Sequence, residues 1–178
     1  MTDIEFELMK IFKKLSERIK PKIVNKVKTF DIKKGMVIVD YGCGPGMYTY
    51  EFSKAVGEEG KVFAVDILEV AKKEIGKIKT RRNISNVEFI LAEGNKSNLA
   101  ERTADMIFVL DVFHKIENTD EFMRELFRIS KNGGTLILDD GHQSRQETKK
   151  SLEQIKEWKI IKETGDCLWL TTHHFSDP

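Results

Sequence analysis

The sequence contains little cysteine and no long apolar run. Its two cysteines, Cys43 and Cys167, lie far apart and form no Cys-x-x-Cys pair, so we expect no disulfide framework and a reducing compartment. No stretch approaches the roughly 18 apolar residues that cross a bilayer. Charged residues alternate with apolar ones from the start of the chain, which argues against a signal peptide or an anchor. These absences favour a cytoplasmic protein that does not enter the membrane.

What the chain does have is the composition of an ordinary globular domain. Its 178 residues are 40% hydrophobic and 33% charged, enough to bury a core without disulfides or a structural metal. The chain has no internal repeat, low-complexity linker or sign of a second domain. We therefore expect one domain over 1–178, with an N-terminal helical cap at 1–30 and a core at 31–178.

Positive charge is concentrated in two runs, although the formal net charge is only +1. The stretch from Lys10 to Lys34 contains ten lysines and arginines but only two acidic residues, and a second basic run extends from Lys72 to Arg82. Such runs can bind nucleic acid. Because the whole chain is nearly neutral, solvated helix faces are the favoured interpretation, and nucleic acid is a possible but less favoured partner.

Apolar runs that are typical of strands alternate with helical patterns along the chain. The strand patterns lie at 36–39, 61–65, 87–91, 106–110, 135–138, 158–161 and 167–171, and the helical patterns at 4–27, 49–56, 68–79, 120–130 and 144–158. Pro21 is expected to divide the first helix, and 131–134 to end the fourth. Continuous apolar strands indicate a sheet covered on both faces. The short turn at 164–166 predicts an antiparallel edge. We expect an α/β, Rossmann-like, doubly wound, mostly parallel seven-stranded sheet.

The first strand pattern ends in an acid and a glycine-rich loop. Gly42, Gly44 and Gly46 alternate with other residues after Asp40, and glycine permits backbone angles that leave room for a ligand on the chain. In a doubly wound sheet this place is near the nucleotide site. A dinucleotide loop would require its third glycine where Met47 stands, and the carboxylate of Asp40 would repel a pyrophosphate. A ligand with ammonium and sulfonium groups fits better, and no Gly-Lys-Ser/Thr follows that would indicate a P-loop.

The segment 40–46 resembles the first motif of class I S-adenosylmethionine-dependent methyltransferases. The resemblance extends from about 30 to 140, and it is nearest to the small-molecule branch of quinone-biosynthesis C-methyltransferases. That branch shares Val-Gly-x-x-Gly-Lys-Val, found here at 56–62, and a Gly-Gly pair, found here at 133–134. The resemblance implies S-adenosylmethionine as the cofactor and S-adenosylhomocysteine as its product.

The family pattern also assigns residues to parts of the cofactor. It places Asp66 at the ribose, an acid and a small residue at the adenine, and the end of the fourth strand at the methionine. The alternatives are a helix N-cap for Asp66 and a solvated loop carboxylate for Glu93. The expected cofactor-binding residues are Asp40, Tyr41, Gly42, Gly44, Gly46, Asp66, Ile67, Glu93, Gly94, Leu110 and Asp111.

Methyl transfer from a sulfonium needs alignment more than protein chemistry. A base is required only if the acceptor loses a proton, and the candidates are His114 and His142, each after a strand. The alternative is that both are loop residues without a catalytic role. No metal is expected, although Asp111 with Asp139 and Asp140 could hold Mg²⁺ or Ca²⁺. His173 and His174 are interpreted as edge-strand or tail residues.

Two features of the predicted loops bear on the methyl acceptor. The fourth-strand loop lacks the Asn/Asp-Pro-Pro-aromatic motif of enzymes that methylate adenine, cytosine or glutamine amino groups. Few residues separate the fifth strand from the next helix, so the site has little lid. We expect a small-molecule acceptor. An RNA or protein methyltransferase, a non-catalytic cofactor-binding subunit and, less favoured, a nicotinamide oxidoreductase remain alternatives, and the oligomeric state is open.

Overall fold

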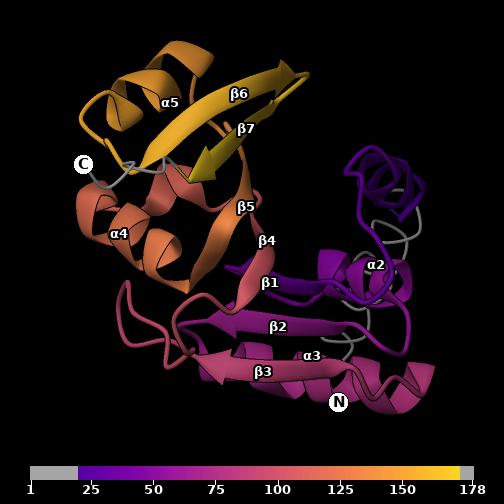
Figure 1. Ribbon diagram of the computed structural model, residues 1–178. Helices are drawn as coiled ribbons and strands as arrows, with labels where there is room; N and C mark the ends of the chain where they lie inside the picture. The colour runs from indigo at the N-terminus through magenta and orange to yellow at the C-terminus, as the bar shows by residue number, and fades with distance from the viewer. Residues whose placement is uncertain (1–19, 173–178) are drawn as a thin grey trace, which may run out of the picture.

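The computed structural model describes residues 20–172, which form an α/β domain around one sheet of seven strands (Figure 1). The strands are β1 (Val37–Tyr41), β2 (Lys61–Asp66), β3 (Val87–Leu91), β4 (Ala104–Val109), β5 (Ser130–Asp139), β6 (Trp158–Thr164) and β7 (Cys167–Thr172). The helices are α2 (Met47–Val56), α3 (Glu69–Arg82), α4 (Thr119–Ile129), α5 (Arg145–Leu152) and the 3₁₀ turn η1 (Phe113–Lys115), preceded by a helical segment at 20–28.

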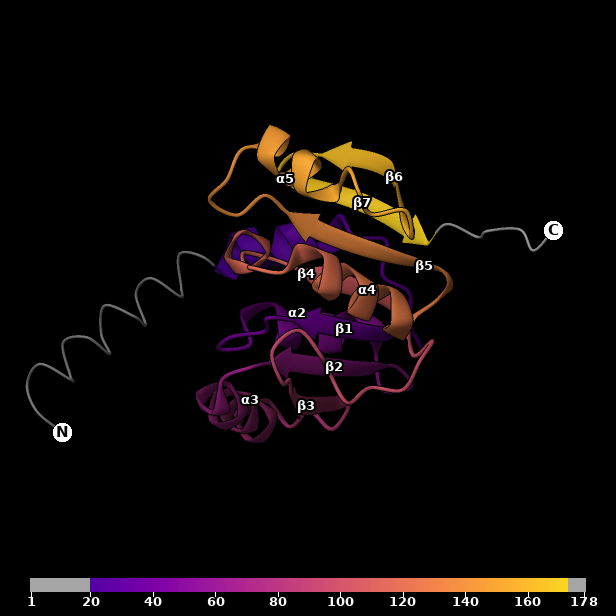
Figure 2. The same ribbon diagram turned by 90° about the vertical axis from the view of Figure 1, so that its left-hand side faces the viewer.

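The sheet has the order β3-β2-β1-β4-β5-β7-β6. The first five strands pair in parallel, and β7 runs antiparallel between β5 and β6 (Figure 2). The strand order reverses at β1 and β4, which both end at the same edge of the sheet. This confirms the predicted doubly wound sheet with an antiparallel strand pair at one edge. In such a sheet the ligand-binding site lies at the carboxyl ends of the central strands, here β1 and β4.

Helices cover both faces of the sheet, so there are two apolar cores (Figure 1). α4 and α5 pack on one face, while 20–28, α2 and α3 pack on the other. Neighbouring residues of a strand enter opposite cores: Ile107 and Val109 face α4, whereas Phe108 faces α2. Each is fully buried, which explains why these strands are apolar without alternation.

An aromatic cluster fixes α2 against the centre of the sheet. The ring of Phe108 on β4 lies 4.2 Å from that of Phe52 on α2 and 5.0 Å from that of Phe30. All three rings are buried, and burying each contributes about 1.5–3 kcal/mol. The cluster holds the start of α2, and so the glycine loop before it, at the end of β1.

Two predicted boundaries are wrong in an informative way. The helix expected at 144–158 ends at Leu152, because Ile155 and Trp158 continue the three-residue spacing but enter the core from a turn and from β6. The strand expected at 135–138 already starts at Ser130, directly after α4 ends at Ile129, with an irregular register between the pairs Ala104–Ser130 and Met106–Thr135.

The N-terminal prediction is tested only in part. Residues 20–28 are helical and bury Ile23 and Val27 against the α2 face. Residues 1–19, which include most of the predicted cap and of the helix expected at 4–27, lie outside the described range, as do His173 and His174. Pro21 itself lies in the helical segment 20–28, and the predicted division there stays a prediction because the residues before it are not described. Among the helices of 20–172, none is both long and apolar enough to span a bilayer.

Candidate functional site

The glycine loop connects β1 to α2 and is tied to the end of β2. Gly42, Gly44 and Gly46 have φ angles of 78°, 49° and 79°, a left-handed backbone that favours glycine. The amides of Gly42 and Cys43 both donate to the carbonyl of Val65, at 2.8 and 3.0 Å. The loop therefore lies across the carboxyl ends of two adjacent parallel strands, as the sequence predicts.

The three glycines serve different purposes. A Cβ at Gly46 would lie 2.6 Å from Cδ1 of Ile75 on α3, and one at Gly42 would lie 2.8 Å from the side chain of Val112. At Gly44 a Cβ would have no atom of residues 20–172 within 4 Å. Gly42 and Gly46 are thus needed for packing, whereas Gly44 faces open space that a ligand could occupy.

Asp66 holds the loop and faces the same space. Its carboxylate accepts hydrogen bonds from the amides of Gly44, at 2.8 Å, and Leu68, at 3.0 Å. α3 starts at Glu69 and its N-cap is Leu68, so Asp66 is not the helix N-cap of the alternative interpretation. Each carboxylate oxygen retains a lone pair, which leaves Asp66 able to accept further hydrogen bonds from a ligand.

Asp40 lies beneath the loop rather than on it. Its carboxyl is buried and accepts a hydrogen bond from the hydroxyl of Thr49, at 2.5 Å. Burial raises the pKa of Asp40 to about 7; the Thr49 hydrogen bond opposes the rise, and the nearby charge of Asp66 adds to it. A positive charge placed above the loop would favour the ionised form.

Tyr41 and Cys43 contribute to the site through the backbone. The ring of Tyr41 is buried against Phe122 of α4, and its hydroxyl donates to the carbonyl of Asn95 at 3.0 Å. The thiol of Cys43 is free and buried, and burial raises its pKa, so it is an inert, small core residue rather than a nucleophile. The side chain of Tyr41 faces away from the loop.

The edge beyond Asp66 is unusually apolar for an exposed surface. Ile67, Leu68 and Val70 all have more than half of their surface exposed. Glu93 and Gly94 follow the adjacent strand β3, where Glu93 is exposed and pairs with Lys96 through two backbone hydrogen bonds. Exposed apolar side chains beside the exposed carboxylate of Glu93 could bind a flat heteroaromatic ring that carries amino groups.

The end of β4 provides the opposite side of the site. Leu110 is buried, and Asp111 adopts a left-handed backbone with φ of 58°, which is uncommon for a residue with a side chain. Its amide donates to a carboxylate oxygen of Asp139 at 2.7 Å, and its own carboxylate is exposed. Asp111 is therefore held in a strained conformation that projects its side chain outward.

The two candidate histidines lie together at this end of the sheet. The rings of His114 in η1 and His142 after β5 meet edge to face, with centroids 4.9 Å apart. Nε2 of His142 is 3.6 Å from Oδ1 of Asp111. The sequence placed both histidines after strands, and the structure adds that they form one cluster with Asp111.

Asp139 and Asp140 have partners that the sequence did not suggest. One oxygen of Asp139 accepts from the Asp111 amide, and the other is 3.0 Å from Nζ of Lys26. Asp140 forms a bidentate pair with Arg145, with Nε 2.9 Å from each oxygen. Lys26 and Arg145 neutralise these carboxylates, so Asp139 and Asp140 do not fit an Mg²⁺ or Ca²⁺ site with Asp111.

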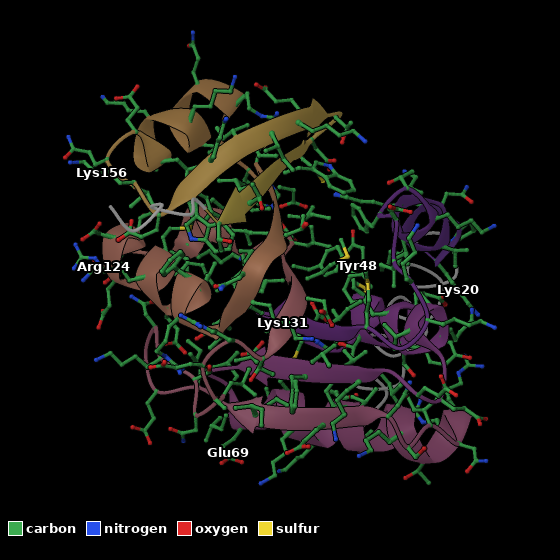
Figure 3. All side chains as sticks on the ribbon, in the orientation of Figure 1. Lys20, Tyr48, Glu69, Arg124, Lys131 and Lys156 are labelled. Atoms are coloured by element: carbon green, nitrogen blue, oxygen red, sulfur yellow. The ribbon has the colours of Figure 1, made fainter. Side chains whose placement is uncertain are left out.

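Lys26 is the main residue that sequence reasoning missed. It projects from the segment 20–28, and its Nζ lies 2.7 Å from Asp166 as well as near Asp139. Burial alone would lower the pKa of Lys26, but the hydrogen bond to Asp166 and the charge of Asp139 hold that pKa above its usual value. Tyr48, labelled in Figure 3, lies close enough to respond to the same charges. Nothing in the basic run distinguished Lys26 from its neighbours.

A family model and a curated relative both match this chain to methyltransferases. Residues 32–173 match the family model described as a methyltransferase domain. Over 109 residues the chain is 32% identical to the ubiquinone/menaquinone biosynthesis C-methyltransferase UbiE of Escherichia coli. That match covers 60% of this chain and 43% of the relative, so the chain aligns with less than half of the curated relative's length.

Solved structures of other methyltransferases share the fold. A SAM-dependent methyltransferase from Aquifex aeolicus superposes with a TM-score of 0.78 at 29% identity, covering 90% of this chain and 95% of the other. A SAM-dependent O-methyltransferase from Thermotoga maritima gives a TM-score of 0.67 at 19% identity, over 89% and 67% of the two chains. The match with the Aquifex aeolicus protein therefore extends over nearly the whole of both chains.

Proposed function

The chain belongs to the class I S-adenosylmethionine-dependent methyltransferases, and from this premise we propose that it transfers a methyl group from S-adenosylmethionine to a small-molecule acceptor. The observation that carries the proposal is the open space above Gly44, bounded by the carboxylate of Asp66. When bound, S-adenosylmethionine supplies an activated methyl group on a sulfonium. The chain has to hold that group in line with the acceptor.

The residues around the loop fit the cofactor group by group. Asp66 would accept hydrogen bonds from ribose hydroxyls, and Ile67 with Glu93 and Gly94 would contact the adenine. The Gly42–Gly46 backbone and the exposed end of β4 at Leu110 and Asp111 would bind the methionine part. Asp40 would act from below, because its buried carboxylate stabilises positive charge above the loop.

The acceptor would approach from the side of His114 and His142. Only residues 140–144 connect β5 to α5, so the described chain offers no lid on this side, and the His142 side chain is 80% exposed. With no metal bound to them, either imidazole could take a proton from an acceptor hydroxyl, thiol or activated carbon. The name of the Escherichia coli relative makes quinone precursors the first acceptors to screen.

The proposal is tested by calorimetric titration with S-adenosylmethionine, S-adenosylhomocysteine and NAD. We expect micromolar binding of both adenosyl ligands and none of NAD. Asp66→Ala should weaken adenosyl binding at least tenfold, because a ribose contact and the support of the Gly44 amide are both lost. The matched control is Glu88→Gln, an exposed carboxylate on β3. Binding of NAD alone, or equal affinities in Asp66→Ala and Glu88→Gln, would contradict the proposal.

A further inference from the structure

Two imidazoles and a carboxylate converge at the ends of β4 and β5. One possible ligand atom from each of Asp111, His114 and His142 lies within 4.8 Å of the others. Asp111 and His114 come from the loop after β4, and His142 from the loop after β5. Neither loop is long, so the parallel pairing of β4 with β5 fixes the meeting of these side chains.

The hydrogen-bonding needs of the His114 ring are not fully met. Its Nδ1 is buried and has no hydrogen-bond partner within the described part of the chain. Burying a polar atom without a partner costs about 1–3 kcal/mol, and such exceptions in a folded protein call for an explanation. Gly141 makes the arrangement possible, because any Cβ there would collide with this nitrogen.

We propose that Asp111, His114 and His142 bind a divalent transition-metal cation of the zinc type. Two imidazole nitrogens and one carboxylate form a ligand set of catalytic zinc sites, which keep further positions open. Mg²⁺ and Ca²⁺ prefer oxygen ligands and would bind here poorly. The left-handed backbone of Asp111, fixed by Asp139, directs the third ligand towards the two rings.

The three ligand atoms, now within 4.8 Å of one another, need to approach only slightly to bind one zinc ion. Zinc bonds of about 2.0–2.2 Å at a tetrahedral angle separate ligand atoms by roughly 3.3–3.6 Å, and Asp111 and His142 already stand 3.6 Å apart. Their side chains are 66% and 80% exposed, so rotation about their χ angles can bring both to the more enclosed His114. The site faces solvent through these two residues, which gives a cation an entry path.

The role of the cation rests on the proposed function, although its binding does not. A metal with open positions at the acceptor side would bind an acceptor oxygen or sulfur and lower its pKa, as a Lewis acid does. The acceptor could then lose its proton to water before it attacks the methyl group, and no protein base would be required. Histidines that bind the metal through their lone pairs would not act as bases.

The test uses Co²⁺, whose visible absorption reports its ligands, on full-length protein freed of metal with a chelator. We expect one equivalent to bind with ligand-field bands, Zn²⁺ to displace it, and Mg²⁺ to have no effect. His114→Ala and His142→Ala should each weaken binding at least tenfold. The matched control is the double variant His173→Ala/His174→Ala, which removes the other two histidines of the chain and should bind Co²⁺ like the wild type.

Three results would overturn the metal site: no saturable bands, equal binding in all variants, or loss of binding only in the double variant. His142 is so exposed that His142→Ala should fold normally, which keeps the test decisive if His114→Ala does not fold. Titrating the metal-free wild type with S-adenosylhomocysteine separates the two proposals. Cobalt binding without adenosyl binding would refute the function and leave the metal site, and the reverse would refute the site alone.

Discussion

Gly44 and Gly165 have nearly the same backbone but different surroundings. Their φ angles are 49° and 55°, and at neither would a Cβ meet an atom of residues 20–172 within 4 Å. Gly44→Ala and Gly165→Ala should each cost about 1–2 kcal/mol of stability, from left-handed strain alone. Only Gly44→Ala should weaken S-adenosylhomocysteine binding, by tenfold or more, because its methyl group would enter the ligand space. Calorimetry and urea unfolding measure both effects, and equal affinities would refute this ligand position.

At Gly46, unlike Gly44, the space for a side chain is filled by other residues of the protein. A Cβ there would collide with Ile75 and Ile78 of α3, so Gly46→Ala adds overpacking of about 1–3 kcal/mol to the backbone strain. We expect it to be clearly less stable in urea than Gly133→Ala, whose φ of 71° is similar and whose Cβ would meet no described atom within 4 Å. Equal losses of stability would show that α3 yields to the new methyl group.

Asp40 makes the stability of the ligand-free protein depend on pH. Burial raises the pKa of its carboxyl from 3.8 to about 7, so folding favours the protonated form, and this contribution is lost as the pH rises from about 4 to 7. Asp40→Asn does not titrate. Its unfolding free energy relative to the wild type should therefore increase by roughly 2–3 kcal/mol between pH 5 and pH 8. A difference independent of pH would contradict this assignment.

Several residues of the candidate site were predictable because they belong to a local motif. The glycines, Asp40 and Asp66 directly follow apolar runs in the sequence. Those runs predicted the ends of β1 and β2 closely, and so the positions of these residues. Thr49, Lys26 and Gly141 were not predictable, since their roles depend on atoms that approach only after the sheet forms. The clustering of His114 with His142 depends in the same way on the pairing of β4 with β5.

At the scale of elements, Lys26 fastens the segment 20–28 to the sheet edge. It bridges Asp139 at the end of β5 and Asp166 in the turn between β6 and β7. Lys26→Met leaves the buried Asp139 carboxylate without its cation, so we expect a loss of about 1–3 kcal/mol in unfolding free energy. Lys33→Met, which removes an ion pair exposed on both sides, should cost less than about 1 kcal/mol. Equal losses in urea unfolding would show that the segment is held by its apolar face alone.

For the whole molecule, the strand order follows from features already visible in the sequence. Alternating strands and helices, continuous apolar runs and one tight turn near 164–166 are sufficient for a doubly wound sheet with an antiparallel edge. Element ends were less predictable: α5 stops at Leu152 because the chain must turn to start β6 at Trp158. Apolar spacing alone does not reveal that turn, since the residues on both sides of it enter the same core.

We propose that the adenosyl cofactor lies across the carboxyl ends of β1, β2 and β4. The most direct test is a two-dimensional ¹⁵N–¹H spectrum of the labelled protein, with amides assigned, during titration with S-adenosylhomocysteine. The largest shifts are expected at Gly42, Gly44, Leu68, Gly94 and Asp111. Gly133 and Gly134, near the amino end of β4 at the opposite edge, should not move. Shifts centred on Gly133 and Gly134, or no shifts at a saturating concentration, would contradict the account.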